Sequence, residues 1–198
     1  MSERPRTLGK IAALAAAGAA LAGGCVGLVT GALAPDLGLG RRTRRLGPQT
    51  LEIDAPRDLV FELIGAPYQE RQPRAFADKV RVLERGADMV LAAHRTPVRG
   101  RLVATTVETV RLSRPDRVDF RLVRGPVPYV VERFTLDAEG GATTVTYDGD
   151  LGTDLWGLGQ RWGDLVADRW EQAVATSLAA VKVEAERRAA RPAPDRET

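Results

Sequence analysis

The spacing of hydrophobic and polar residues changes along the chain and divides it into three regions. Residues 11–34 contain no charged residue. Between residues 49 and 151, short segments with alternating apolar positions are separated by turn signals, such as those at residues 86–88 and 114–116. From about residue 156 to residue 190, apolar residues recur at steps of three and four. The pattern predicts an apolar N-terminal helix, a β-rich middle and a long C-terminal helix.

The main domain is predicted to cover residues 49–190. A first strand is expected at Leu51, Ile53 and Ala55, and Pro56 suits the first position of a short helix that ends before Pro67. Residues 68–78 are expected to form a second short helix or an irregular loop. Six further strands follow, and their short connections favour antiparallel pairing. The predicted strands are Val80–Arg85, Met89–His94, Leu102–Leu112, Val118–Val123, Tyr129–Leu136 and Thr143–Leu151.

This order of elements predicts an α+β fold. Seven antiparallel strands have an apolar face to bury, and one long amphipathic helix can lie across that face. A single helix is narrower than such a sheet, so a curved sheet around it is expected to leave an oily cavity between them. The predicted apolar positions of the helix are Leu158, Trp162, Leu165, Val166, Trp170, Val174, Leu178 and Val181.

Residues 11–34 are long enough to cross a bilayer core of about 30 Å as a single transmembrane helix, and this is the leading interpretation. Three alternatives stay open. Residues 32–34 fit the small-residue rule of a cleaved signal peptide, although Pro35 is a poor residue after a cut. Cys25 weakly fits a lipoprotein anchor, although the apolar run continues beyond it. A buried soluble helix is the last alternative.

The segments that flank the apolar run suggest its orientation. Residues 1–10 form an N-terminal flank, and residues 35–48 read as an arginine-rich linker containing Arg41, Arg42, Arg44 and Arg45. The small excess of positive charge after the run predicts a cytoplasmic domain on a single-pass cell-membrane protein. The arginine run either contacts anionic headgroups or only stops transfer.

Glycine recurs at every fourth position in the apolar run, at Gly23, Gly27 and Gly31. On a helix these residues share one face, where a second helix can approach closely. One interpretation is therefore a homodimer through the membrane segment. The other interpretation is that the spacing arose by chance, because the run is rich in glycine.

Composition removes several classes of function. The 198 residues are 44% hydrophobic and 28% charged, with a net charge of +3. The arginines mostly alternate with Asp and Glu, which argues against a nucleic-acid partner. The single cysteine excludes an intramolecular disulfide and a Cys-rich zinc site. No cofactor or metal is expected, and residues 191–198 read as a disordered tail.

Several segments of the domain resemble the START-like or SRPBCC superfamily, also called polyketide cyclase/dehydrase-like or helix-grip proteins. The likeness rests on the strand-Ala-Pro-helix opening at residues 53–64, the strand at 130–134, the hairpin at 140–147 and the terminal helix. It covers about 140 residues. The resemblance implies a helix-grip fold and a pocket for a lipid, sterol, hormone, quinone or polyketide; only a minority of the superfamily are enzymes.

Two glutamates are the leading candidates for the site. In the strand from Tyr129, Glu132 shares a side with Val130, Phe134 and Leu136, so it should face the core. A buried carboxylate is costly unless it binds a polar group of a ligand or pairs with an arginine. Glu108 has similar standing on its own strand, although both sides of that strand are fairly apolar.

His94 is the only histidine in the chain. It cannot form a common zinc site without further ligands, and acid–base chemistry is its functional interpretation. Its position near the predicted strand end favours a rim or surface residue. His94 and Glu132 are nevertheless the two catalytic candidates.

The remaining candidates are residues that could contact a ligand in the expected cavity. Trp162 and Trp170 lie two turns apart on one face of the helix, where packing and ligand contact coincide. Tyr129 and Tyr147 offer hydroxyl groups to a ligand. The complete predicted set is Glu132, Glu108, Phe134, Tyr129, Tyr147, Trp162, Val166 and Trp170.

The sequence favours binding, transport or sensing of a hydrophobic small molecule by a membrane-tethered domain. Two alternatives stay open. One is a cyclase or dehydratase-type enzyme that uses Glu132 or His94 as a base. The other is a protein-interaction module whose cavity has no function.

Overall fold

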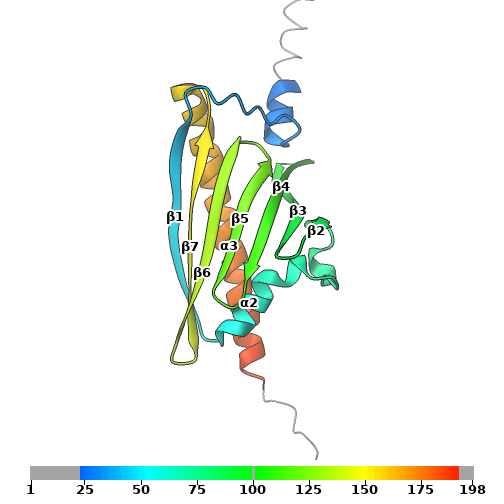
Figure 1. Cartoon of the computed structure of the whole chain (residues 1–198), viewed down its shortest axis with the longest axis vertical. Coiled ribbons are helices and arrows are strands. Elements are labelled where there is room, and N and C mark those ends of the chain that lie inside the picture. Colours follow the sequence, from blue (N-terminus) through cyan, green and yellow to red (C-terminus); the bar gives the residue numbers. More distant parts are fainter. Residues whose placement is uncertain (1–22, 100, 192–198) are drawn as a thin grey trace, which may run out of the picture.

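The computed structural model describes residues 23–99 and 101–191. Seven strands form one antiparallel sheet in the order β1-β7-β6-β5-β4-β3-β2, and helix α3 runs lengthwise behind it (Figure 1). The elements are β1 (Arg42–Ile53), α2 (Arg57–Gly65), η1 (Ala66–Tyr68), η2 (Arg74–Phe76), β2 (Val80–Arg85), β3 (Met89–Arg99), β4 (Leu102–Ser113), β5 (Arg117–Arg124), β6 (Tyr129–Glu139), β7 (Ala142–Thr153) and α3 (Trp156–Ala189).

The predicted helix-grip arrangement is confirmed. Strand β2 begins and ends at the predicted residues, and the five strands after it are longer than predicted by one to five residues at an end. The largest extension is in β3, which continues through Pro97 to Arg99 and pairs with β4 almost to its end. His94 therefore lies well inside a strand rather than near its end.

Strand β1 begins at Arg42, inside the segment predicted to be a linker, so that prediction is wrong for residues 42–48. The strand pairs with β7 from Arg42 onward. A bulge separates Leu46 from Gln49, and Gly47 adopts a φ of 71° there. A side chain at Gly47 would collide with the Tyr147 carbonyl oxygen, so glycine is required. The Gly–Pro sequence of this bulge resembles a linker, which explains the error.

The arginine run contacts the domain itself. Arg44 lies within 3.4 Å of carboxylates of Asp164, Asp168 and Glu171 on α3. Arg41 binds the buried Asp154 carboxylate with an N–O distance of 2.8 Å. The remaining two arginines contact Gln160 and the pair Asp148 and Asp150. These contacts join β1 to β7 and α3.

Helix α3 packs against β1, β7 and α2. Val166, Ala167, Leu178 and Ala185 are buried on its inner face. Two positions of the predicted apolar face are instead exposed: Leu158 and Leu165 expose 73% and 53% of their surface. They fall on the solvent side because the buried face uses small residues, such as Ala167, that the apolar pattern underweights.

Among the described residues, no helix is long and apolar enough to cross a membrane. Half of the predicted span, residues 11–22, lies outside the described part. Residues 23–29 are helical, but the chain leaves the helix near Gly31, where φ is 71°. The Thr30 carbonyl accepts a hydrogen bond from the Thr105 amide at 3.0 Å. The predicted helix therefore does not continue to residue 34.

The predicted glycine stripe is not continuous. The Leu33 side chain covers Gly27, and the left-handed Gly31 lies against the backbone of Thr105 and Gly125. Gly23 has open space around it. The three residues therefore do not form one free helix face of the kind that the dimer interpretation needs.

Candidate functional site

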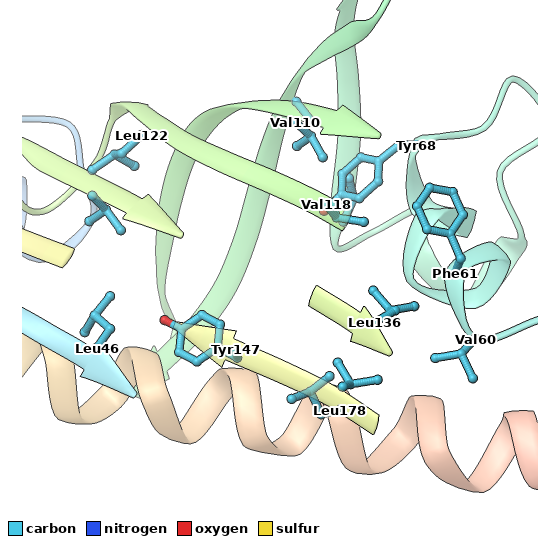
Figure 2. Packing of buried hydrophobic residues seen from close by; sticks show 14 of the residues in the cluster. Leu46, Val60, Phe61, Tyr68, Val110, Val118, Leu122, Leu136, Tyr147 and Leu178 are labelled. Carbon is cyan, nitrogen blue, oxygen red and sulfur yellow. The ribbon is translucent and has the colours of Figure 1, made fainter. Parts of the chain in front are cut away.

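The inner face of the sheet carries an aromatic row that crosses four elements. The row joins Tyr68 of η1 to Phe120 of β5, Phe134 of β6 and Tyr147 of β7, with successive ring centroids 6.0, 5.6 and 5.2 Å apart. Figure 2 shows Tyr147 close to α3, and Tyr68 at the opposite side beside Val110 and Val118. Phe120 and Phe134 stay partly exposed although their strands lie in the middle of the sheet. The α3 helix therefore leaves accessible space over this row.

Glu132 lies on this inner face, as its alternation with Val130 and Phe134 predicts. It is 7% exposed, and its Oε1 accepts a hydrogen bond from the Trp170 indole at 2.7 Å. On the neighbouring strand it faces Gly149, where a side chain would press against the Glu132 backbone. Burial, and then the charge of Glu108, raise the pKa of Glu132 to about 8, against the opposing effect of Trp170. The carboxyl group is therefore largely protonated at neutral pH.

Glu108 is the second buried carboxyl group and belongs to a chain of polar side chains. Its Oε2 lies 3.2 Å from Nδ1 of His94, but the geometry of this contact does not fit a hydrogen bond. Nε2 of His94 is hydrogen-bonded to the Tyr68 hydroxyl at 2.9 Å. These contacts bring β4, β3 and η1 together at one point. Tyr68, His94 and Glu108 therefore form a polar chain with one hydrogen bond and one close contact that is not aligned as a hydrogen bond.

Burial opposes charge on every member of this chain. It raises the pKa of Glu108 to about 7 and lowers the pKa of His94 to about 4. It also raises the pKa of Tyr68, to which the carboxylate charges of Glu108 and Glu132 contribute. The imidazole is therefore neutral at pH 7. Among the described residues, no lysine or arginine forms a salt bridge with Glu108 or Glu132.

Tyr147 connects the aromatic row to Glu132. Its residue is fully buried, and its hydroxyl has no well-aligned partner. Burial, and then the nearby carboxylate of Glu132, raise the pKa of the Tyr147 phenol. An unsatisfied buried hydroxyl is unusual and marks a place where a polar ligand atom can gain a hydrogen bond.

The other predicted site residues divide into two groups. Val166 is buried against the core, and Trp162 donates a hydrogen bond to the Pro126 carbonyl at 2.8 Å. Both residues belong to α3 and pack between this helix and the sheet. Tyr129 lies on the outer face, because it is opposite Gly152 and alternates with the inward Val130. The predicted contact of its hydroxyl with a ligand stays untested, and from the outer face Tyr129 cannot join the aromatic row.

Sequence reasoning also missed Tyr68 and misplaced His94. Tyr68 follows Pro67 in a short 3-10 turn, where no periodicity assigns a face. Its only sequence signal is an aromatic residue inside an otherwise polar connection. His94 was expected at the rim, but its side chain is only 17% exposed.

A hollow of about 840 Å³ lies at the edge strand β2 and not between the sheet and α3, where a cavity was predicted. Its lining mixes residues of β2 and of the loop that precedes it with outer-face residues such as Arg81, Arg95 and Thr105. Its walls combine charged and aliphatic side chains and include no aromatic residue, unlike the inner face. In the described ranges, no group of three or more His, Cys, Asp or Glu side chains could hold a metal ion.

Comparison with known proteins identifies the class of fold. The structure aligns with an aromatase/cyclase from Streptomyces sp. R1128 with a TM-score of 0.61 and 21% identity, over 75% of this chain and 95% of that one. It also aligns with norcoclaurine synthase from Thalictrum flavum, with a TM-score of 0.51 and 12% identity over 69% and 88% of the two chains.

A START superfamily protein from Mycobacterium smegmatis has a TM-score of 0.52 and 14% identity, over 71% of this chain and 99% of that one. No family model and no curated protein matches the sequence. The chain has the START-like, helix-grip fold of the polyketide cyclase type, as the sequence resemblance predicted. At these identities the likeness shows the fold alone.

Proposed function

We propose that the domain binds an apolar, ring-containing small molecule that carries a hydroxyl or carbonyl group. The observation that carries this proposal is the combination of partly exposed inner-face aromatic rings with two buried carboxyl groups that lack a cationic partner among the described residues. Rings stack on rings, and the carboxyl groups meet the polar atom of the ligand.

The protonation state of the carboxyl groups decides what they recognise. A protonated Glu132 donates a hydrogen bond to a ligand carbonyl or hydroxyl, while its other oxygen accepts from Trp170. The Tyr147 hydroxyl, which lies beside Glu132 without an aligned hydrogen bond, offers a second polar contact. An anionic ligand, such as a fatty acid carboxylate, would place two acidic groups together and is disfavoured.

The structural neighbours support a ring-containing ligand. One neighbour is an aromatase/cyclase, and another is norcoclaurine synthase in complex with dopamine and hydroxybenzaldehyde. Both have the same fold, and the two named ligands are aromatic compounds with hydroxyl groups. The aromatic row of this chain suits ligands of that chemistry.

The test is a binding titration with a panel of hydroxylated polycyclic aromatic compounds, quinones and fatty acids, followed by native mass spectrometry. We expect Glu132→Leu to weaken binding of the preferred compound by about tenfold, because a leucine side chain cannot donate a hydrogen bond to the ligand. Glu139→Leu, an exposed change at the end of the same strand, is the matched control. Phe134→Ala should also weaken binding, because it removes a partly exposed ring from the aromatic row. Equal binding by all four proteins would contradict the proposal.

A second candidate function is acid–base catalysis on such a molecule. The favouring observation is the chain Tyr68–His94–Glu108 beside a carboxyl group whose pKa of about 8 suits proton transfer near neutral pH. If the domain is an enzyme, His94→Gln should lower kcat at least a hundredfold while ligand affinity changes little. Unchanged turnover in that variant would leave binding as the function.

We also propose that the uncharged run beginning at residue 11 tethers this domain to a membrane, which would bring the site next to a reservoir of apolar ligands. Extraction of membranes with alkaline carbonate tests this tether. The intact chain should stay in the membrane pellet, and Leu14→Arg should release it. Complete extraction of the intact chain would contradict the tether and leave the binding proposal unaffected.

A further inference from the structure

Exposed apolar side chains gather at one end of the folded domain. Of twelve large apolar residues that are exposed in the described ranges, nine come from four segments: residues 26–39, the end of β3, the end of β5 and residues 155–158. We call these segments the apolar end. The remaining three, Leu83, Leu165 and Val183, are scattered over β2 and α3. Monomeric proteins rarely expose a contiguous patch of this kind without a partner.

The most exposed part of the apolar end is the turn into α3. Leu158 is 73% exposed and Trp156 is 58% exposed. Leu155 and Trp156 have φ angles of 67° and 50°, a left-handed conformation that residues other than glycine rarely adopt. The structure holds both residues there, because their amides donate hydrogen bonds to the Leu39 and Gly40 carbonyls at 2.8 and 3.0 Å.

A buried carboxylate fixes the second half of the apolar end. Asp154 accepts hydrogen bonds from the amides of Leu37 and Gly38 at 2.7 and 2.8 Å, and from the guanidinium of Arg41. The side chains of Leu37 and Leu39 then project into solvent, with 54% and 56% of their surface exposed. The polar groups of this segment are satisfied internally and the apolar groups face outward, which is the reverse of an ordinary surface loop.

The charges around the apolar end are mainly positive. Arg42, Arg101 and Arg124 are exposed in or next to its segments. The single exposed acid of those described segments, Asp36, is paired with Arg41. An apolar patch surrounded by arginines suits a surface that is apolar inside and anionic outside.

The path of the chain indicates which surface this is. The described chain starts at Gly23 at this same end (Figure 1), and the sequence before it, residues 11–22, contains no charge. We propose that the apolar end of the folded domain lies on an anionic lipid surface, with Trp156 and Leu158 at the level of the headgroups. This surface is separate from the inner-face site, and the proposal does not depend on the ligand.

The test uses the fluorescence of the intact chain, which has three tryptophans, mixed with vesicles of phosphatidylcholine and phosphatidylglycerol at three to one. Half of the phosphatidylcholine is replaced by a brominated form that quenches tryptophan on contact. Trp162 and Trp170 face the inside of the domain, so Trp156 should account for most of the quenching. We expect Trp156→Phe to remove at least half of the quenching.

Two further variants separate a lipid surface from local structure. Leu158→Ser should lower quenching by about twofold while keeping the far-ultraviolet circular dichroism of the parent. Val183→Ser is the matched control, because Val183 is similarly exposed near the other end of α3. Equal quenching in the intact chain and in Trp156→Phe would overturn the proposal, as would a failure of the intact chain to bind the vesicles.

A second copy of the chain is the alternative partner and gives a different result. In that case Trp156 would be shielded from the soluble quencher acrylamide without vesicles, and dilution would remove the shielding. That outcome also overturns the proposal. Carbonate extraction tests the membrane tether independently of this proposal. A chain that resists extraction but shows no quenching of Trp156 is tethered to the membrane, while its apolar end does not contact the lipid.

Discussion

The two halves of the sheet bury their inner faces in different ways. Strands β1 and β7 lie against α3, and their inward residues, such as Leu46 and Val145, are fully buried. Strands β3 to β6 carry Glu108, Glu132 and His94 on the same face, together with partly exposed aromatic rings. We call these the packed half and the polar half. The packed half consists of apolar contacts, while the polar half adds buried titratable groups to its apolar core.

The difference shows that one helix buries only part of the inner face of a seven-stranded sheet. α3 covers the strands nearest to it and excludes water there, so apolar side chains fill the contact. Farther from the helix, closure depends on α2 and the short turn η1, which contributes Tyr68. The buried polar groups of this half contact one another: His94 accepts or donates a hydrogen bond with Tyr68 and lies 3.2 Å from Glu108.

The largest effect should come from the packed half. Leu46 is fully buried between β1 and α3, so Leu46→Ala should lower the free energy of unfolding by about 3 kcal/mol. Chemical denaturation monitored by circular dichroism measures this loss. The exposed change Val123→Ala is the control and should cost less than about 0.5 kcal/mol. Similar losses in the two variants would contradict a packed half.

In the polar half, Glu132→Gln should raise the free energy of unfolding rather than lower it, and the size of this gain should depend on pH. The folded-state pKa of about 8 lies above the ordinary 4.5, so the folded protein holds this proton more tightly than the unfolded chain. The carboxyl group therefore stabilises the fold fully below pH 4.5, and this stability is lost as the pH rises through 8.

The amide that replaces the carboxyl group in this variant does not titrate. Glu132→Gln should thus be more stable than the parent by at least about 2 kcal/mol at pH 9 and nearly equal to it at pH 4. Denaturation of both proteins at the two pH values measures the difference. A difference independent of pH would mean that Glu132 is ionised in the folded state throughout this range.

Tyr68→Phe tests the polar chain with a smaller effect. The change removes the hydroxyl bonded to His94 and leaves the ring in the aromatic row, so we expect a loss of about 1 kcal/mol. Nuclear magnetic resonance of the imidazole measures whether the pKa of His94 changes in this variant. The pKa of His94 is held near 4 by burial, so it should stay well below 6.5 in the variant; a return to 6.5 would show that the closure by η1 had opened.

The smallest effect is expected at the rim of the packed half. The Arg45 side chain is 67% exposed and pairs with Asp148 and Asp150. Arg45→Gln should therefore cost about 0.5 kcal/mol or less, and high salt should remove even that difference. A loss comparable with that of Leu46→Ala would mean that the arginine contacts, and not apolar packing, hold β1 in place.

Much of the fold and part of the site were predictable from the sequence. Alternation around Glu132 assigned it to the inner face because three of its neighbours on that side are apolar, and the structure agrees. Glu108 was harder to assign, since both sides of its strand are apolar. His94 was misplaced because the strand continues through Pro97 to Arg99, which local propensity does not favour.

The sequence by itself determined the order and type of the elements, because period-two and period-3.6 patterns report directly which side of each segment is buried. Only the tertiary structure decided that Tyr68 meets His94 and that the arginine run pairs with α3. These contacts join residues far apart in the chain. They depend on strand register and on the approach of one element to another, neither of which leaves a local signal.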